Sequence, residues 1–243
     1  MSDLMIETPA AARKSLLTRM AAFIAVTSVV WGGYYWWRPP APMLGLHHVE
    51  HLPPSTKEVC MTFDDAPHPL TTPLLLAALK GSHIHGSFMC VGNNLMLYPE
   101  LARRMVEDGH HLADHSQYHH NLTTVTPAEY DHEVETCFKV ISADHGQPTS
   151  LFRPPGGGLN RSEMQYLYDH HVTLAWWSSD VGDYAIPDAW AIASGVIATL
   201  RPGDILLLHD ELASTPKAVP LIAKEAFKRG YTFVPMPESA PLR

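Results

Sequence analysis

Short apolar runs alternate with helical patterns along most of the chain, and this alternation constrains the fold more than any other feature. Strands that alternate with helices form a parallel sheet covered by helices, either open and doubly wound or closed into a barrel. The sequence therefore predicts an α/β fold. The expected strands are 57–63, 84–91, 110–114, 150–152, 171–177, 204–208 and 231–234, and the expected helices lie near 72–80, 98–108, 127–143, 161–169, 187–200 and 215–229.

Polar residues capable of chemistry follow five of the expected strands. In parallel α/β folds the active site lies at the C-terminal ends of the strands. Five such ends converge more readily at the mouth of a barrel than in the crevice of an open sheet. No glycine-rich phosphate loop follows the first strand, which argues against nucleotide binding. The clusters are Asp64-Asp65, His115 to His119, Arg153 to Gly157, Asp180 to Tyr184, and His209-Asp210.

His115 and His119 are four residues apart and can present both imidazoles to one metal ion. A carboxylate can complete a three-ligand site, and three protein ligands with one open position are typical of a catalytic zinc centre. The paired Asp64 and Asp65 offer such a carboxylate and a second one that can deprotonate water.

Further residues can complete this chemistry. His209 can protonate a leaving group, Arg153 can hold the base ionised, and Asp180 can orient His209. Together these groups indicate metal-assisted hydrolysis of an amide or an ester.

The same five segments, in the same order, resemble the motifs of the polysaccharide deacetylases, the NodB-homology domains of the family 4 carbohydrate esterases. The resemblance extends from about Lys57 to Pro237. It implies a distorted (β/α) barrel that holds one divalent metal, usually zinc, with cobalt, nickel or manganese as alternatives. The matching segments are Thr62 to Pro67, His115 to His119, Phe152 to Gly156, Asp180 to Tyr184, and Leu207 to Asp210.

The resemblance also assigns roles to individual residues. Asp65, His115 and His119 match the metal ligands, and Asp64 matches the general base that acts on metal-bound water. Ser116 lies in the same His-Ser-x-x-His motif and is expected to steady the loop that holds the ligands.

The resemblance also assigns the group that acts on the leaving amine: His209 matches the general acid that protonates it, with Asp180 as its carboxylate partner. Arg153 matches the residue that positions the base. Gly156 matches the backbone N–H that stabilises the oxyanion, and Leu207 matches an apolar wall against the acetyl methyl group. Asp183 is interpreted only as a residue that orients its loop.

Three positions depart from the family pattern. Ala66 stands where the family usually has glycine, and a left-handed backbone there would be strained. Gly156 replaces an aromatic residue, and Tyr184 replaces the usual tryptophan of the substrate-facing wall. These changes affect the fit of the substrate, whereas every expected metal and proton-transfer position is filled.

An apolar segment without charges, Met20 to Trp37, lies near the N-terminus and would span ~27 Å as a helix. Basic residues precede it, which places the N-terminus in the cytoplasm. We expect an uncleaved signal anchor, with a cleaved signal peptide and a buried core helix as the alternatives. The expected organisation is a cytoplasmic tail at 1–19, a transmembrane anchor at 20–37, a proline-rich linker at 38–56 and the deacetylase domain at 57–243.

The formal net charge of −8 argues against nucleic acid as a partner. The three cysteines, Cys60, Cys90 and Cys137, have no metal-ligand spacing and are expected to be buried, unreactive thiols.

We therefore expect an enzyme on the single-pass inner (plasma) membrane, with its catalytic domain outside the cytoplasm. It would remove N-acetyl groups from an N-acetylglucosamine-containing glycan, either peptidoglycan or an extracellular polysaccharide. The alternatives are a deformylase or deacetylase of a lipid-linked sugar at the membrane surface, and a non-catalytic glycan-binding barrel. The expected partners are the glycan and the membrane, without nucleotide or nucleic acid, and the oligomeric state stays open.

Overall fold

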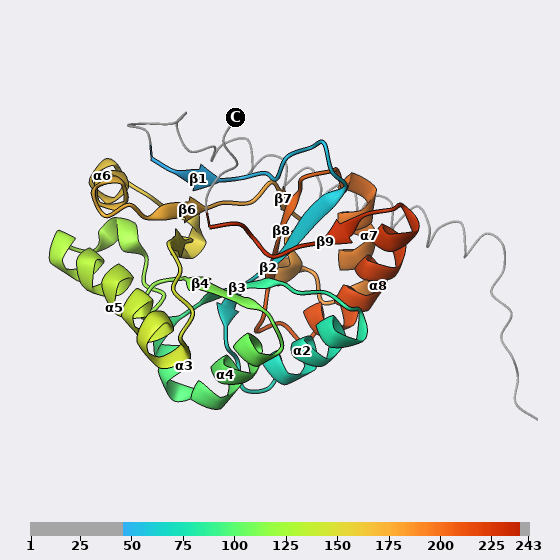
Figure 1. Ribbon diagram of the computed structural model, residues 1–243, viewed down its shortest axis with the longest axis horizontal. Coiled ribbons are helices and arrows are strands. Elements are labelled where there is room, and N and C mark those ends of the chain that lie inside the picture. The colour runs from blue at the N-terminus through green and yellow to red at the C-terminus, as the bar shows by residue number, and fades with distance from the viewer. Residues whose placement is uncertain (1–45, 239–243) are drawn as a thin grey trace, which may run out of the picture. The chain divides into compact units, whose positions relative to one another are not determined.

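A curved sheet of parallel strands forms the centre of the structure, a computed structural model that describes residues 46–238 (Figure 1). The strand order is β1-β6-β5-β4-β3-β2-β8-β7, and β9 pairs with the start of β2. Each pair of neighbouring strands is parallel. The strands are β1 (His48–Val49), β2 (Glu58–Ala66), β3 (Ser87–Cys90), β4 (His111–Asp114), β5 (Leu151–Phe152), β6 (Thr173–Ala175), β7 (Ser179–Asp180), β8 (Ile205–His209) and β9 (Thr232–Phe233).

The expected (β/α) barrel is confirmed in its parallel strands and its alternating helices, but the ring is incomplete. Within residues 46–238, β1 and β7 are the two ends of the strand order and do not pair with each other. The sheet is therefore a curled half-barrel rather than a closed one.

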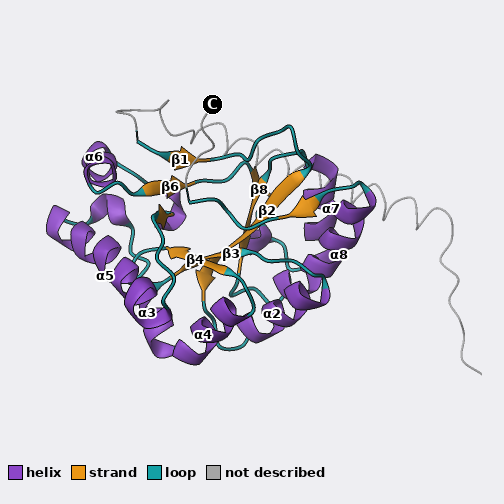
Figure 2. Ribbon diagram, viewed as in Figure 1, coloured by secondary structure: helices purple, strands orange, loops and turns teal. Residues whose placement is uncertain are grey.

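Helices cover the outer face of the sheet (Figure 2). Two begin with capping boxes that the sequence indicates: Thr126 and Glu129 cap α5, and Asn160 and Glu163 cap α6. The helices are α2 (Thr72–Gly81), α3 (Gly92–Leu97), α4 (Pro99–Glu107), α5 (Pro127–His145), α6 (Arg161–Asp169), α7 (Ala189–Thr199) and α8 (Thr215–Lys228). The sequence analysis did not identify α3, β1 or β7.

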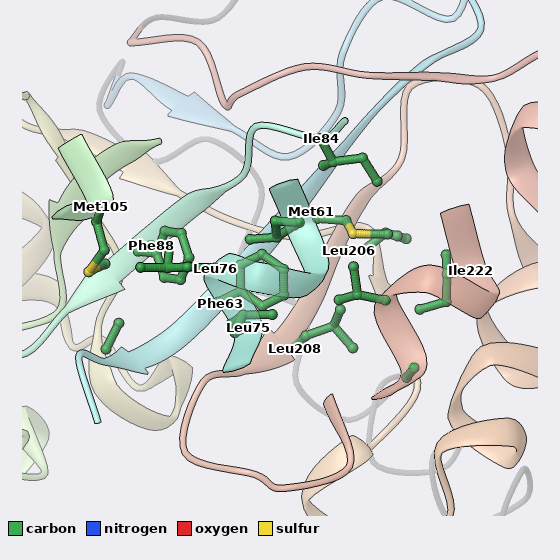
Figure 3. Packing of buried hydrophobic residues seen from close by; sticks show 14 of the residues in the cluster. Met61, Phe63, Leu75, Leu76, Ile84, Phe88, Met105, Leu206, Leu208 and Ile222 are labelled. Carbon is green, nitrogen blue, oxygen red and sulfur yellow. The ribbon is translucent and has the colours of Figure 1, made fainter. Parts of the chain in front are cut away.

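The main hydrophobic core lies between the sheet and these helices (Figure 3). The rings of Phe63 and Phe88 lie 5.1 Å apart on neighbouring strands. Helices α2 and α8 contribute Leu75, Leu76 and Ile222 to the same cluster.

Alternation along β2 explains how one strand serves both the core and the site. Successive side chains of a strand point to opposite faces. Met61 and Phe63 belong to the outer core beneath the helices, whereas Cys60 belongs to the separate inner cluster. Thr62 and Asp64 share the face of Cys60, so the inner face becomes polar toward the C-terminal end of the strand.

The three cysteines are free and buried, as expected. Burial raises the pKa of Cys60 to about 12, and it raises the pKa of Cys90 and of Cys137 as well. Thiols of this kind are weak nucleophiles.

The boundary expected at residue 57 is wrong, because part of the expected linker belongs to the folded unit. Strand β1 pairs with β6, and Leu46, Val49 and Leu52 are buried. The Leu52 N–H also donates to the Gly203 carbonyl at 2.8 Å. A two-residue strand among prolines and histidines is too short to produce a periodic pattern.

The expected cytoplasmic tail at 1–19 and transmembrane anchor at 20–37 lie outside the described residues. Among residues 46–238, no helix has the length and apolar character that crossing a bilayer requires.

Candidate active site

Three potential metal ligands lie together at the C-terminal ends of β2 and β4. The donor atoms of Asp65, His115 and His119 all lie within 4.8 Å of one another. His119 Nε2 lies 3.0 Å from Asp65 Oδ1, and His115 Nε2 lies 3.7 Å from the same oxygen. The residues predicted as ligands are therefore brought to one place.

Local backbone geometry turns Asp65 into the site. The pairing of β2 with β3 shifts register between Phe63 and Ala66, and Asp65 has a φ of 69°. Aspartate adopts this left-handed region more readily than most residues. The condition under which Ala66 would be strained is not met, because the positive φ falls at Asp65 and Ala66 lies buried in the strand.

The loop that carries the two histidines is held in a strained conformation. Ser116 and His119 have φ values of 67° and 59°. The hydroxyl of Ser116 accepts from the His119 N–H at 2.9 Å, and Asp114 Oδ1 accepts from the Ser116 N–H at 2.6 Å. Glu133 on α5 accepts from the Tyr118 N–H at 2.8 Å. These contacts compensate for the unfavourable backbone.

The donor set fits a zinc-type ion. His115 Nδ1 lies 2.7 Å from the Arg153 carbonyl, which can only accept, so Nδ1 carries the proton and the Nε2 lone pair faces the site. Burial lowers the pKa of His115, which favours the neutral imidazole that a metal needs. Two imidazole nitrogens and one carboxylate oxygen form a common zinc ligand set.

The charge state of Asp65 is also suitable for a ligand. Burial opposes its ionisation, but the hydrogen bond from His119 and the charge of His115 together keep the pKa of Asp65 below its usual value. It is therefore expected to be a carboxylate throughout the neutral range.

Asp64 lies beside this cluster and pairs with a buried arginine. Arg153 is fully buried, and its Nη1 lies 2.6 Å from Asp64 Oδ1 and 2.9 Å from the Thr62 hydroxyl. Its remaining nitrogens donate to the carbonyls of Ala175 and Trp176 at 3.0 and 3.1 Å. The arginine is thus fixed on both sides, and it fixes Asp64 in turn.

The carboxylate that contacts His209 is Asp183, and the prediction of Asp180 is wrong. Asp183 Oδ1 lies 2.7 Å from His209 Nδ1, and Asp183 Oδ2 accepts from the His209 N–H at 2.8 Å. Asp180 instead accepts from the Gly182 N–H at 2.7 Å. Gly182 has a φ of 66° and turns the chain between the two aspartates, so the second one reaches the histidine.

This pairing sets the charge of His209. Burial opposes protonation, but the hydrogen bond that His209 donates to Asp183 and the charge of Asp64 outweigh it and raise the pKa of His209 to about 9. At neutral pH the imidazole therefore carries a proton that it can donate.

Two of the three expected substrate-facing positions, Leu207 and Tyr184, lie on the side of His209. Leu207 follows the alternation of β8 onto the face of His209, and it is buried. The ring of Tyr184 is 64% exposed and lies 5.8 Å from the His209 ring. Gly156 has a φ of 62° in an exposed turn after β5, where a glycine is the least strained residue.

Asp210, for which the sequence suggested no catalytic role, is a buried acid next to His209. Asp210 accepts from the Thr72 hydroxyl and from the His68 N–H, and burial raises its pKa to about 7. It thereby joins the start of α2 to the end of β8.

Comparison with known proteins agrees with this geometry. The family model described as "Polysaccharide deacetylase" matches residues 51–175. A chitooligosaccharide deacetylase of Bradyrhizobium sp. is 31% identical over 75% of this chain and 90% of its own length. A peptidoglycan-N-acetylglucosamine deacetylase of Bacillus cereus is 29% identical over 77% of this chain and 90% of its own.

The fold also matches solved structures. The crystal structure of the Bc1960 peptidoglycan N-acetylglucosamine deacetylase superposes with a TM-score of 0.79 at 24% identity, covering 84% of this chain and 97% of that one. The chain belongs to the polysaccharide deacetylase family, and its deacetylase relatives identify it as a hydrolase that acts on carbon–nitrogen bonds other than peptide bonds.

Proposed function

We propose that the protein removes N-acetyl groups from N-acetylglucosamine units of a glycan, and that it does so with one divalent metal. The observation that carries this proposal is the arrangement of two differently charged groups at one mouth. Asp64 is paired with a buried arginine, and His209 is held protonated by Asp183, beside the three ligand atoms. A carboxylate and an imidazolium kept in opposite protonation states are a base and an acid ready for one reaction.

Asp65, His115 and His119 would hold the metal. When bound there, the ion would supply Lewis acidity to the acetyl carbonyl and lower the pKa of water. The mixed oxygen and nitrogen ligands favour zinc, with cobalt, nickel and manganese as alternatives.

Asp64 accepts the proton of the attacking water. The guanidinium of Arg153 forms an ion pair with this carboxylate, and the four hydrogen bonds of that arginine keep the carboxylate from rotating away. Gly156 would donate its N–H to the oxygen that becomes negative when the carbonyl is attacked.

His209 donates its proton to the nitrogen of the departing amine as the carbon–nitrogen bond breaks. Asp183 maintains the imidazolium and its orientation. Leu207, on the same face of β8, offers an apolar contact for the acetyl methyl group.

The experiment is acetate release from N-acetylglucosamine oligomers by the purified full chain, with zinc added, beside the Asp64→Asn variant. We expect release by the parent and at least about a hundredfold less by the variant, because general base catalysis contributes 10²–10⁴-fold. Equal release by both would overturn the role of Asp64. A folded, metal-loaded parent that releases no acetate would overturn the proposed substrate and favour a lipid-linked sugar.

We also propose that this domain acts outside the cytoplasm, tethered to the inner (plasma) membrane. The support is the charge-free segment 20–37 with basic residues before it. Fusion of a periplasmic reporter after residue 243 tests it, because an inactive reporter in intact cells would contradict this topology.

A further inference from the structure

We propose that Tyr118 forms a stacking surface for a sugar unit that neighbours the one being deacetylated, with the imidazoles of His120 and His132 along its edges. The proposal rests on the proposed function and deepens it, because it makes the substrate an oligosaccharide or a longer glycan. Tyr118 immediately precedes the potential ligand His119, so a ring at this position lies within one residue of the reaction centre.

The ring is exposed although it lies beside a site of buried residues. Tyr118 is 48% exposed, whereas His115, Ser116 and Gln117 before it are buried. The ring centroid lies 5.7 Å from that of His120 and 6.3 Å from that of His132, with interplanar angles of 35° and 41°. Three aromatic rings thus gather at the surface, and the Tyr118 ring is carried by the residue next to the potential ligand His119.

The loop does not need the Tyr118 side chain for its own stability. Its backbone is fixed by Glu133, which accepts from the Tyr118 N–H, and by the Ser116 hydroxyl, which accepts from the His119 N–H. A large ring that is half exposed and makes no required contact in the loop is available for a ligand.

The two imidazoles are already held by hydrogen bonds before a ligand arrives. The side chain of Glu133 is 3% exposed, and its Oε1 lies 2.6 Å from His120 Nδ1. His132 Nδ1 lies 3.0 Å from the Thr136 hydroxyl one helical turn away. Each imidazole is held through Nδ1, so its Nε2 is the atom that can meet a sugar hydroxyl. Preorganised groups lose less entropy on binding.

A pyranose unit matches this chemistry. One face of the sugar ring presents C–H groups, which pack on an aromatic face, and its edge carries hydroxyls, which need hydrogen-bonding partners. Tyr118 supplies the face, and the two imidazoles supply groups that donate or accept at its edge. A flat apolar ligand would leave the Nε2 atoms of both imidazoles without a partner from the ligand.

The test compares β-1,4-linked N-acetylglucosamine pentamer and dimer as substrates of the full chain loaded with zinc. We expect Tyr118→Ala to lower the ratio of kcat/KM for the pentamer to that for the dimer by about three- to tenfold, the size of one aromatic contact. Tyr118→Phe keeps the ring and should retain most of the ratio. Tyr168→Ala is the matched control, because Tyr168 is 45% exposed at the end of α6, on the side where β6 begins.

Several outcomes would overturn the proposal. They are an unchanged ratio in Tyr118→Ala, an equal loss in Tyr168→Ala, or weaker zinc binding in Tyr118→Ala by calorimetric titration, which would indicate support of the ligand loop. Failure of the proposed function is distinguishable, because then the parent releases no acetate from either oligomer. In that case calorimetric binding of the pentamer tests the surface directly, and equal affinities of parent and Tyr118→Ala would refute it.

Discussion

Replacing Asp183 by asparagine should remove the carboxylate that keeps His209 protonated. The amide has nearly the same shape but carries no charge, so the imidazolium loses its 2.7 Å ion-pair partner. An opposite charge at this distance raises the pKa of a histidine by about one to three pH units. We therefore expect the pKa of His209 to fall from about 9 toward its ordinary value.

The same shift has a consequence for stability whose sign follows from linkage. The pKa of His209 is raised from 6.5 to about 9 in the folded chain. Its stabilising contribution is complete below pH 6.5 and is lost as the pH rises through 9. At about 1.4 kcal/mol for each pH unit, the contribution to the free energy of unfolding is on the order of 3 kcal/mol at most. Asp183→Asn should thus destabilise the chain more at pH 6 than at pH 10.

Two assays measure these effects. In a plot of kcat for acetate release against pH, the fall on the alkaline side should begin at a lower pH in Asp183→Asn than in the parent, because the proposed acid His209 must be protonated to act. Denaturant unfolding of the metal-free chain at pH 6 and pH 10 measures the linked change in stability. Asp180→Asn is the control, since Asp180 accepts from the Gly182 N–H and does not contact His209. An alkaline limb that moves in Asp180→Asn and stays in place in Asp183→Asn would refute the reasoning.

Three further perturbations test other parts of the structure. Glu133→Gln should weaken zinc binding about ten- to hundredfold by calorimetric titration, as loss of an outer hydrogen bond does, whereas Glu135→Gln on the exposed side of α5 should not. Arg153→Met should lower the free energy of unfolding by about 3–5 kcal/mol, because it leaves Asp64 buried and unpaired. The double variant Arg153→Met with Asp64→Asn should recover part of this lost stability, and denaturant unfolding measures both changes. Burial opposes ionisation of Glu238, but its hydrogen bonds outweigh burial and lower its pKa to about 2. Its contribution to the free energy of unfolding is therefore present above pH 4.5 and is lost as the pH falls through 2. The free energies of unfolding of the parent and of Glu238→Gln should differ at neutral pH and converge below pH 2.

The sequence predicted the parts of the site that are tied to strand ends. Asp64, Asp65, His115 and Arg153 each follow a strand with an apolar run long enough to be recognised, and parallel strands bring those ends to one edge. The order of strands and helices was therefore enough to predict that these side chains lie close together. The strands β1 and β7 escaped prediction because polar residues make up or flank them, whereas the equally short β5 is the apolar pair Leu151–Phe152.

The errors at the site lie where geometry within a loop decides the outcome. Asp180 ends a strand and fits the general rule, but a left-handed Gly182 turns the chain and brings Asp183 to His209. The glycine between two aspartates was the available signal. Glu133 is harder to find, because on the sequence it is one of several acidic residues of an amphipathic helix, and only its burial reveals its contact with the ligand loop.

The stability of the half-barrel and the position of the proposed base, Asp64, depend on the same few side chains. Alternation along β2 sends Phe63 into the core beneath the helices and Asp64 to the inner face. A shift of the strand by one residue would therefore point Asp64 into the core and Phe63 into the site. The inner face is then filled by Arg153, a buried charge that is tolerated only because Thr62, Asp64 and two strand carbonyls satisfy it. A neutral replacement of Arg153 could fill the same volume, but it would release the carboxylate of Asp64. The polar interior is therefore explained by the placement of the base rather than by the stability of the fold.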